Sequence, residues 1–541
     1  METYCGGSDQ GLDRVLLWRL AAAAVLLIAG LFLRSLPPAV SVVLFILSML
    51  TAGYDWLVRT VADCLRNRRP DENLLMCLAV ITAAAIGHAA EGALAVILIR
   101  LGDLLLCRGM ERAYRRIEAM ADERDDEVWR VLEDLRTGTA ERSRTEESVA
   151  HFAGVYTAVV IVVAVVIAAA LPLAFHTTVR EGVYRALVLL LIACPCAVVR
   201  SVPLCFSAAI GGASGRGILF RSAAALEEAG ITGPVVLDKS SALEGSGLRV
   251  VAVKSEKMEA DVLLRIAAHA CAYSDGVYAE SIKAAYQDTI YIELIQSFQQ
   301  DPGQGITVEV EGVKILLGLE DFVRAHGVDP GEDRTDEPCA YLAIDGKYAG
   351  RIVFGSVPRA EALSAVRRLS WERDRTITLV TEEPEAAAAK FARSIGLENV
   401  RSGCGPEEKL ALVKELQETA PTGERIMFVG GAEGNEACLA AADTGVALGG
   451  SAAAMHAADI VVMENSLSDV TEAIGTARRT RTVLRHGLIL VLAVKAVILI
   501  LDMLGVCPLW LAVQADAGAA LIAVLNALTA SGVERVPEEN T

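Results

Sequence analysis

Two cysteines flank a proline at Cys194-Pro195-Cys196, inside a long apolar stretch of the sequence. Proline has no backbone N–H, so it deprives one carbonyl of its helical partner and opens the backbone locally. Thiolates are soft ligands that suit zinc, cadmium, lead or copper(I). The triplet therefore predicts a metal site in apolar surroundings. A plainer alternative, in which the cysteines only fill space and the proline only kinks a helix, stays open on the triplet alone.

Two ionisable residues late in the chain strengthen the metal prediction. Lys495 and Asp516 each lie in an apolar stretch of about 20 residues, where charged side chains are costly and are usually paired or functional. Asp516 would add a carboxylate to two thiolates, a ligand charge of about −3. A divalent ion cancels two of these charges and Lys495 can cancel the third, so the set favours Zn2+ or Cd2+ over copper(I). The alternative is a Lys495–Asp516 pair that only ties two helices together.

Two more acidic residues, Glu91 and Asp103, lie in an earlier apolar stretch. Acidic side chains at such depth can line a route for an ion or its counter-protons. A structural pairing of Asp103 with Arg100 or Arg108 is an equally good interpretation.

Spanning helices are needed to position these residues, and the composition supplies the apolar length. The chain has 541 residues, of which 53% are hydrophobic and 22% are charged, and its mean hydropathy is +0.42. A helix crosses the hydrocarbon core with about 20 apolar residues, so we predict about eight spans. They lie at residues 16–33, 40–61, 74–106 (two spans, with a break near Gly87), 152–174, 183–210, 488–504 and 509–528.

The net charge argues against nucleic-acid partners, and the positions of the arginines predict the orientation of the chain in the membrane. Lys and Arg total 50 while Asp and Glu total 68, a net charge of −18, so nucleic-acid binding is not expected. Arg66, Arg68 and Arg69 follow the second span, and four arginines between residues 108 and 116 follow the fourth. Because positively charged loops stay in the cytoplasm, we expect an integral membrane protein, in contact with lipid, with both termini cytoplasmic.

Between the sixth and seventh spans, short apolar strands alternate with amphipathic helices. Strands are expected at residues 235–238, 376–381, 426–430, 445–448 and 460–463, and helices at 384–394, 406–416 and 435–442. This alternation predicts a parallel, doubly wound sheet. Hairpin signals around Gly312 and Gly346 interrupt the pattern, so residues 250–355 are expected to form an inserted α+β domain.

Together these features resemble the heavy-metal P-type ATPases. That family has eight spans, a Cys-Pro-Cys in the sixth and a split cytoplasmic sheet, and residues 217–222 (Gly-Ile-Leu-Phe-Arg-Ser) are similar to its link into the phosphorylation domain. Lys495, and Asp516 followed by Ala517-Gly518, match its zinc/cadmium/lead branch. The resemblance implies an ATP-driven exporter of the bacterial plasma membrane, which forms an aspartyl-phosphate.

The resemblance also implies a fold class and a domain layout. The fold is expected to be a polytopic α-helical membrane protein of about eight spans, with a cytoplasmic α/β domain of the haloacid-dehalogenase (Rossmann-type) kind that carries an inserted α+β domain. The layout is four spans in 1–107, a truncated, helical actuator-region linker in 108–151, two spans in 152–210, a phosphorylation-like domain in 211–249 and 356–485, a nucleotide-binding-like insert in 250–355, and two spans with a short tail in 486–541.

The catalytic positions match the family only in part. Asp238 matches its nucleophile and Lys239 follows, but the family's Thr-Gly-Thr is replaced by Ser240-Ser241-Ala242, which lacks the glycine and the last hydroxyl. The family's actuator domain, with its Thr-Gly-Glu loop, has no counterpart in the short stretch 108–151.

The groups that handle phosphate and magnesium are also altered. Of the family's Thr-Gly-Asp only the threonine remains, as Thr381, and Lys409 matches its phosphate-contacting lysine. The magnesium-binding aspartate position is Gly431, and Glu433 or Glu436 is a weak substitute.

The nucleotide pocket retains one motif of the family and lacks another. Gly303 and Gly305 match the family's nucleotide-contacting Gly-x-Gly, although such a pair alone is common turn chemistry. Gly276-Val277 replaces its His-Pro.

Three functions remain open on these residues. The first is a family member that binds a divalent heavy metal in the membrane but is catalytically defective, with Mg2+ and ATP in doubt as cofactors, and that acts as a sensor, a passive route or a partner of a complete metal pump. The second is a working zinc/cadmium ATPase with unusual replacements. The third is a structural membrane protein without a metal role.

Overall fold

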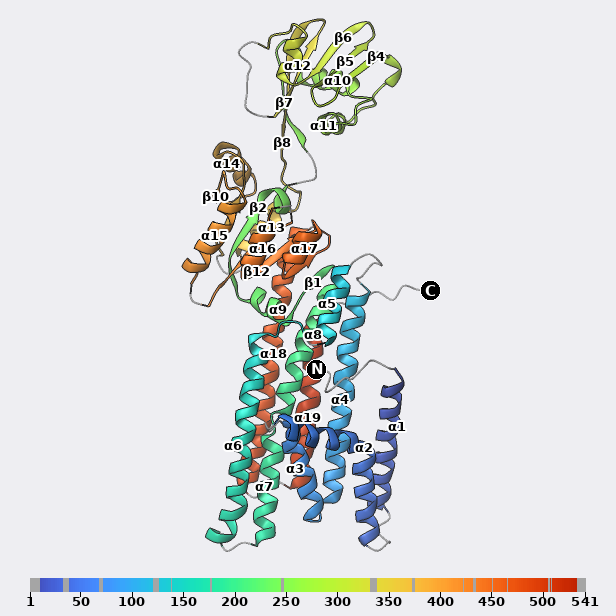
Figure 1. The fold of residues 1–541 in the computed structure, drawn as a ribbon, viewed down its shortest axis with the longest axis vertical. Helices are drawn as coiled ribbons and strands as arrows, with labels where there is room; N and C mark the ends of the chain where they lie inside the picture. Colours follow the sequence, from blue (N-terminus) through green and yellow to red (C-terminus); the bar gives the residue numbers. More distant parts are fainter. Residues whose placement is uncertain are drawn as a thin grey trace. The chain divides into compact units, whose positions relative to one another are not determined.

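The computed structural model of the chain describes most of residues 10–532 (Figure 1). The internal residues outside the description are 33–37, 68–71, 120–125, 138, 176–177, 245–247, 331–337, 372–374, 422, 432–433, 450, 465, 505 and 507. Arg68, Arg69 and Glu433, on which parts of the sequence interpretation rest, are therefore outside the described residues. The chain divides into two compact units, which are Met1–Val236 with Pro406–Thr541, and Leu237–Gly405.

Long helices build most of the first unit. They are α1 (Gln10–Phe32), α2 (Pro38–Asn67), α3 (Glu72–Ala85), α4 (Ala89–Glu118), α6 (Arg144–Phe175), α7 (Val179–Ala193), α8 (Cys196–Ser214), α18 (Leu467–Met503) and α19 (Leu509–Leu528). Helices α4, α8, α18 and α19 pack side by side (Figure 1). A buried apolar cluster joins residues of α1 to α4 with α7, α8, α18 and α19, and it includes Cys194 and Cys196.

The count of spans differs in detail from the expected eight. Six stretches of the described chain are long and apolar enough to cross a membrane, and the apolar helix Asn73–Ala85 is shorter. Helix α4 is not among the six, because Glu91, Arg100 and Asp103 interrupt its apolar sequence. The third and fourth expected spans are thus a short helix and a charged one, and the fold class itself is confirmed.

The second helix bends in its middle. Gly53 interrupts α2 with non-helical dihedral angles of φ −140° and ψ 18°. A Cβ atom at this position would lie 2.6 Å from Val96 Cγ1 on α4, so only glycine lets the two helices approach this closely. The bend places Asp55 and Trp56, which follow it, beside α4.

The described residues between α4 and α6 contain one helix. It is α5 (Asp126–Thr137), which packs against α4, and the described residues here form no strand. Tyr114 on α4 donates a hydrogen bond to the carbonyl of Leu135 at 3.2 Å, which fixes α5 to that helix.

A sheet continues from the helices of the first unit. Its strands are β1 (Ile218–Phe220), β2 (Thr232–Asp238), β11 (Arg425–Gly430), β12 (Thr444–Leu448) and β13 (Ile460–Val462), and they follow one another in the order β1-β13-β12-β11-β2. Strands β11, β12 and β13 are parallel, as the alternation of strands and helices predicted. Strand β1 is antiparallel to β13, which the sequence did not indicate. Helices α9 (Ala223–Gly230), α15 (Pro406–Thr419), α16 (Glu436–Ala441) and α17 (Ala452–Ala457) connect or flank these strands.

The second unit contains an antiparallel sheet with the order β3-β8-β7-β6-β5-β4. Its strands are β3 (Arg249–Ser255), β4 (Ile295–Asp301), β5 (Gly305–Val310), β6 (Val313–Gly318), β7 (Cys339–Ile344) and β8 (Lys347–Gly355). The two predicted hairpins are confirmed as β5–β6 and β7–β8, with Gly312 and Gly346 at positive φ in the turns. Helices α10 (Ala260–Ala270), α11 (Val277–Ala285) and α12 (Glu320–Ala325) accompany this sheet, and β9 (Ile377–Val380), β10 (Asn399–Arg401), α13 (Ala362–Trp371) and α14 (Glu385–Ser394) complete the unit.

One half-buried carboxyl makes the stability of the first unit depend on pH. Burial raises the pKa of Asp459 from 3.8 to about 6, against the opposing effects of its hydrogen bond from the Gly445 N–H and of Arg221. An acid with a raised folded-state pKa binds protons more tightly when folded, so stability falls as pH rises from about 4 to 6, by about 3 kcal/mol. We expect Asp459→Asn, which keeps the acceptor for Gly445, to raise the thermal midpoint at pH 7 and to leave it unchanged at pH 3.5. An equal midpoint at pH 7 would contradict this.

Candidate metal centre and phosphorylation site

The Cys-Pro-Cys triplet breaks a helix in two, as predicted. Helix α7 ends at Ala193, Cys194 is extended with φ −61° and ψ 125°, and α8 begins at Cys196. Both sulfur-bearing residues are buried, with Cys194 0% and Cys196 6% exposed. Cys196 occupies the N-terminus of α8, where the helix dipole favours negative charge on a thiolate. The break thus presents two thiols at an opening of the backbone.

Lys495 and Asp516 meet beside this break. Lys495 Nζ, from α18, lies 2.5 Å from Asp516 Oδ1 on α19, and it also donates to the carbonyl of Ile192 at 3.0 Å. That carbonyl is in the last turn of α7, where the helix break removes intrahelical partners. The Cys196 thiol donates to the other carboxylate oxygen, Asp516 Oδ2, at 3.6 Å. The structure therefore brings the predicted residues of the metal set together.

In this arrangement the ammonium group of Lys495 takes the place of a cation. Both oxygens of Asp516 have a partner, and among the described residues no three Cys, His, Asp or Glu side chains are grouped as a metal site. A divalent ion would have to displace Lys495 from Oδ1 and the thiol protons from sulfur. The chemistry of the donor set fits such an ion, because two thiolates, a carboxylate and an ammonium group together carry the charge that one divalent cation neutralises.

The two acids considered for an ion route do not meet. Glu91 lies in the first turn of α4, where its Oε1 is 3.2 Å from His88 Nδ1. Asp103 lies twelve residues later on the same helix, about 18 Å along its axis. Asp103 is 5% exposed and accepts from Arg100 at 3.2 Å and from Arg200 at a short distance. The pairing with Arg100 that the sequence offered is therefore confirmed, and Arg200 is a partner that it did not offer.

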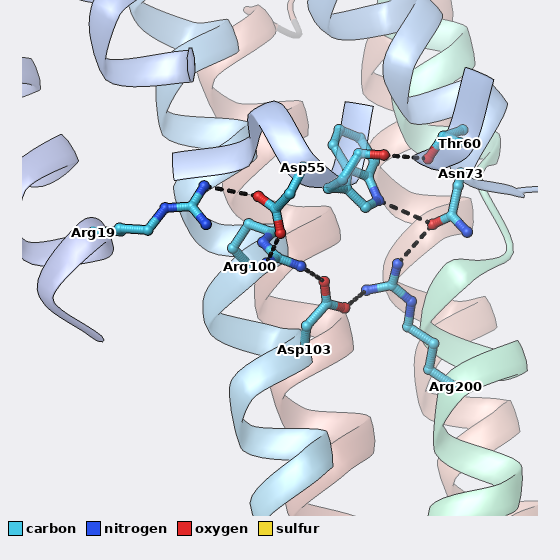
Figure 2. A network of polar contacts seen from close by, with 8 residues as sticks. Arg19, Asp55, Thr60, Asn73, Arg100, Asp103 and Arg200 are labelled. Atoms are coloured by element: carbon cyan, nitrogen blue, oxygen red, sulfur yellow. Dashed lines mark hydrogen bonds and ion pairs between the residues drawn. The ribbon is translucent and has the colours of Figure 1, made fainter. Parts of the chain in front are cut away.

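A polar network that the sequence analysis did not identify surrounds Asp103 (Figure 2). Arg100 Nη2 donates to Asp55 Oδ2 at 2.9 Å, and Arg19 Nη2 donates to Asp55 Oδ1 at 2.7 Å. Arg200 Nη2 donates to Asn73 Oδ1 at 2.9 Å. The sequence signals were the possible pairing of Asp103 with Arg100, and an arginine four residues after Cys196 inside a predicted span.

In the second unit, the carboxylate of Asp238 is held by its own neighbours. It ends β2, and Asp238 Oδ2 accepts from the Ser240 hydroxyl at 2.7 Å, the Ser241 hydroxyl at 2.7 Å and the Ser241 N–H at 3.2 Å. The serines that replace the family's threonine and glycine thus bind the oxygen of the candidate nucleophile. A carboxylate that accepts three hydrogen bonds at one oxygen is a weaker nucleophile.

The lysine beside it has its charge compensated within the unit. Lys239 is 2% exposed, and its Nζ lies 2.6 Å from Glu383 Oε1, is ion-paired with Glu244 at a short distance, and donates to Ser356 Oγ at 2.7 Å. It also lies 4.6 Å from the centre of the Phe391 ring. These carboxylates neutralise the ammonium charge of Lys239, which would otherwise be available to pair with a phosphoryl group. Neither Glu244 nor Glu383 was predicted as a partner.

Gly431 stands where the resembled family has its magnesium-binding aspartate, and the backbone around it leaves little space for a side chain. A Cβ atom at Gly431, which follows β11, would lie 2.4 Å from the carbonyl oxygen of Leu448 and 3.4 Å from that of Gly449. Glu436, the described substitute, accepts from its neighbour Gly434 N–H at 2.9 Å. The described residues here do not fit a magnesium ion held as in the resembled family.

The remaining predicted residues are buried or lie at a turn. Thr381 is 5% exposed and its hydroxyl accepts from the Glu383 N–H at 3.2 Å. Lys409, on α15 of the first unit, is 5% exposed, although a lone helix lysine is ordinarily solvated. Gly303 is at φ +76° in a turn, and a Cβ atom at Gly305 would lie 2.4 Å from the Phe322 ring. The Gly-x-Gly pair therefore serves turn geometry and packing.

The curated proteins that resemble this chain are named as metal-transporting ATPases. No protein-family model matches the sequence. The chain is 28% identical over 604 aligned positions to the cadmium, zinc and cobalt-transporting ATPase of Bacillus subtilis, with 95% of this chain and 86% of that protein covered. It is 32% identical over 408 residues to the zinc-transporting ATPase of Synechocystis, and 27% identical over 427 residues to the cadmium, zinc and cobalt-transporting ATPase of Helicobacter pylori. The chain spans less than two thirds of the last two, 56% and 62%.

Solved structures give the same fold. A crystal structure of a zinc-transporting PIB-type ATPase in its E2.Pi state matches with a TM-score of 0.70 and 22% sequence identity, and the match covers 95% of this chain and 99% of that one. The E2P state of a zinc-transporting PIB-type ATPase matches with a TM-score of 0.69. At this identity the likeness concerns the fold.

Proposed function

From the premise that the chain belongs to the heavy-metal P-type ATPases, in their zinc/cadmium/lead branch, we propose that it binds a divalent heavy metal within the membrane and that its ATP-driven pumping is impaired. The observation that carries the first part is the meeting of Cys196, Asp516 and Lys495 at the break between α7 and α8. The relatives transport cadmium and zinc, so Zn2+ or Cd2+ is the ion proposed.

The donor set supports a doubly charged soft cation. Two thiolates and one carboxylate carry about three negative charges, and Lys495 cancels one of them. When the ion is bound, the Lys495 ammonium would leave Asp516 Oδ1 and remain on the carbonyl of Ile192, to which it already donates at 3.0 Å. The ammonium group thus neutralises the carboxylate while the ion is absent, and it balances the extra charge while the ion is present.

The impairment of pumping rests on the second unit and on Gly431. One oxygen of the Asp238 carboxylate accepts from two serine hydroxyls, and the Lys239 charge is shared by Glu244 and Glu383. Phosphoryl transfer needs a cation to neutralise the phosphate, and no carboxylate can stand at residue 431 without displacing the backbone of β12. These features support a protein that holds metal and cycles poorly or not at all.

A second candidate is a working ATP-dependent zinc/cadmium exporter. It is favoured by the printed activity of the relatives, which are transporting ATPases, and by the presence of Asp238 and Lys239 in sequence. The two candidates share the metal site and the membrane, and they differ in whether Asp238 becomes phosphorylated.

A zinc titration tests the metal site. We expect the detergent-purified protein to bind one equivalent of Zn2+ tightly, and we expect Cys194→Ser/Cys196→Ser to lose that equivalent, because serine hydroxyls are poor ligands for a soft ion. Cys205→Ser is the matched control, since Cys205 is a buried cysteine of the same helix, 1% exposed, and its sulfur faces the carbonyl of Thr480. The same stoichiometry in the double variant and the control would remove the site.

A further inference from the structure

We propose that Arg19, Arg100 and Arg200 form a fixed positive barrier that slows the arrival of a divalent cation at Cys194 and Cys196. The inference rests on the proposed function, because it presumes that these thiols bind the metal. It concerns a different property of the same site, the rate at which the ion reaches it.

The network lies one helical turn from the thiol pair. Arg200 follows Cys196 by four residues on α8, so their side chains lie on the same face of the helix, about 6 Å apart along its axis. Arg200 is on the side of Cys196 toward β1, the strand into which α8 leads. A cation that approaches Cys196 along α8 from that end reaches the guanidinium group before the sulfur.

Among the described side chains, the charges of the network do not cancel. Three guanidinium groups, from Arg19, Arg100 and Arg200, face two described carboxylates, from Asp55 and Asp103, which leaves one net positive charge among these five groups (Figure 2). The side chains of Arg100 and Arg200 are 14% and 12% exposed. Charge at such sites is screened less than at a surface, so its repulsion of a second cation is strong.

Both carboxylates are occupied, so neither can attract an incoming ion. Asp103 accepts from Arg100 at Oδ2 and from Arg200 at Oδ1. Asp55 accepts from Arg19 at Oδ1 and from Arg100 at Oδ2. An acid that could have lined an ion route is thereby converted into part of a barrier.

The barrier is held in place by several helices. Arg19 belongs to α1, Asp55 to α2, Arg100 to α4 and Arg200 to α8, and Asn73 of α3 accepts from both Arg200 and the Trp56 indole N–H. Thr60 donates to the Trp56 carbonyl at 2.9 Å. Movement of any one guanidinium group would break contacts to other helices, so the positive charge stays where it is.

The rate of cadmium uptake by the thiols tests this barrier. Cd2+ alone is added to the full-length protein in detergent, and the rise of cadmium–thiolate absorption gives the association rate. We expect Arg200→Leu to raise the rate about tenfold or more, because electrostatic changes of association rates are of this size. Arg200→Lys, which keeps the charge, should stay near the wild-type rate. Arg19→Leu, which removes a charge without touching Asp103, should raise the rate several-fold and remains informative should Arg200→Leu not fold.

Arg185→Leu is the matched control. Arg185 is a paired arginine of α7, 3.1 Å from Glu181 and 3.4 Å from Asp502, and it is not part of the network. Its rate should equal that of the wild type. Equal rates in wild type, Arg19→Leu and Arg200→Leu, or a rise in Arg200→Lys as large as in Arg200→Leu, would overturn the barrier and leave the metal site intact. Absence of any cadmium–thiolate signal in the wild type would overturn the proposed function and the barrier with it.

Discussion

Replacement of Asp516 by asparagine is expected to lower the free energy of unfolding by about 3 kcal/mol and to abolish tight zinc binding. The Asp516 and Lys495 side chains are 6% and 14% exposed and lie 2.5 Å apart. Removing one partner leaves the other as an uncompensated buried charge, which typically costs about 3–5 kcal/mol. We take the lower end, because Lys495 retains the Ile192 carbonyl as an acceptor. The measurement is unfolding by SDS titration in mixed micelles.

The double variant Lys495→Met/Asp516→Asn separates charge from packing. It removes both charges, so most of the lost stability should return, although zinc binding should not. Asp502→Asn is the matched control, because Asp502 is an acid of the neighbouring helix α18, and its 3.4 Å pair with Arg185 predicts a smaller loss. Wild-type stability in Asp516→Asn would show that the pair does not hold the helices together, and full zinc binding would remove Asp516 from the ligand set.

The meeting of Lys495 and Asp516 beside the Cys-Pro-Cys break could be predicted from sequence, because local backbone chemistry and the cost of buried charge require it. Proline lacks the backbone N–H that a helix interior uses, so it favours a helix break, and α7 ends just before Pro195. Two charges in separate apolar stretches, Lys495 and Asp516, have few alternatives to pairing with each other. The helix break also frees the Ile192 carbonyl that Lys495 binds, a detail that depends on how α18 packs and that no spacing reveals.

The pairing of Asp103 with Arg100 was offered by the sequence and is confirmed, but its contact with Arg200 and the partners of Lys239 could not be predicted in the same way. Arg200 is 97 residues from Asp103, whereas the candidates considered from sequence, Arg100 and Arg108, are near neighbours. Glu383 lies far along the chain from Lys239, and its meeting with that lysine depends on how the second unit folds. Contacts of this kind are set by tertiary packing, and periodicity carries no signal for them.

Two other features also could not be predicted from the sequence. They are the antiparallel pairing of β1 with β13 and the close contact between Gly431 and the backbone of Leu448. The run Ile218–Phe220 is a strand of three residues directly after a spanning helix, too short to give a period. At Gly431 the sequence showed only that a carboxylate was missing. The structure adds that the carbonyl oxygen of Leu448 fills the space which that side chain would need.

Incubation of the wild-type protein with labelled ATP, magnesium and zinc is expected to leave almost no acid-stable label at Asp238. Losing the magnesium ligand removes several kcal/mol of transition-state stabilisation, or a rate loss of about a hundredfold or more. The hydrogen bonds from Ser240 and Ser241 and the pairing of Lys239 with Glu383 add to this loss. Asp238→Asn supplies the background level, measured by acid-quenched filter binding.

A carboxylate restored at residue 431 is not expected to restore phosphorylation. In Gly431→Asp the new Cβ atom would meet the Leu448 carbonyl at 2.4 Å, and forcing it in should cost about 1–3 kcal/mol of stability. A single reversion at residue 431 also leaves Lys239 bound to its two glutamates within the second unit. Acid-stable label in the wild type that disappears in Asp238→Asn would show instead that this chain is a working ATPase whose altered residues perform the same chemistry by another arrangement.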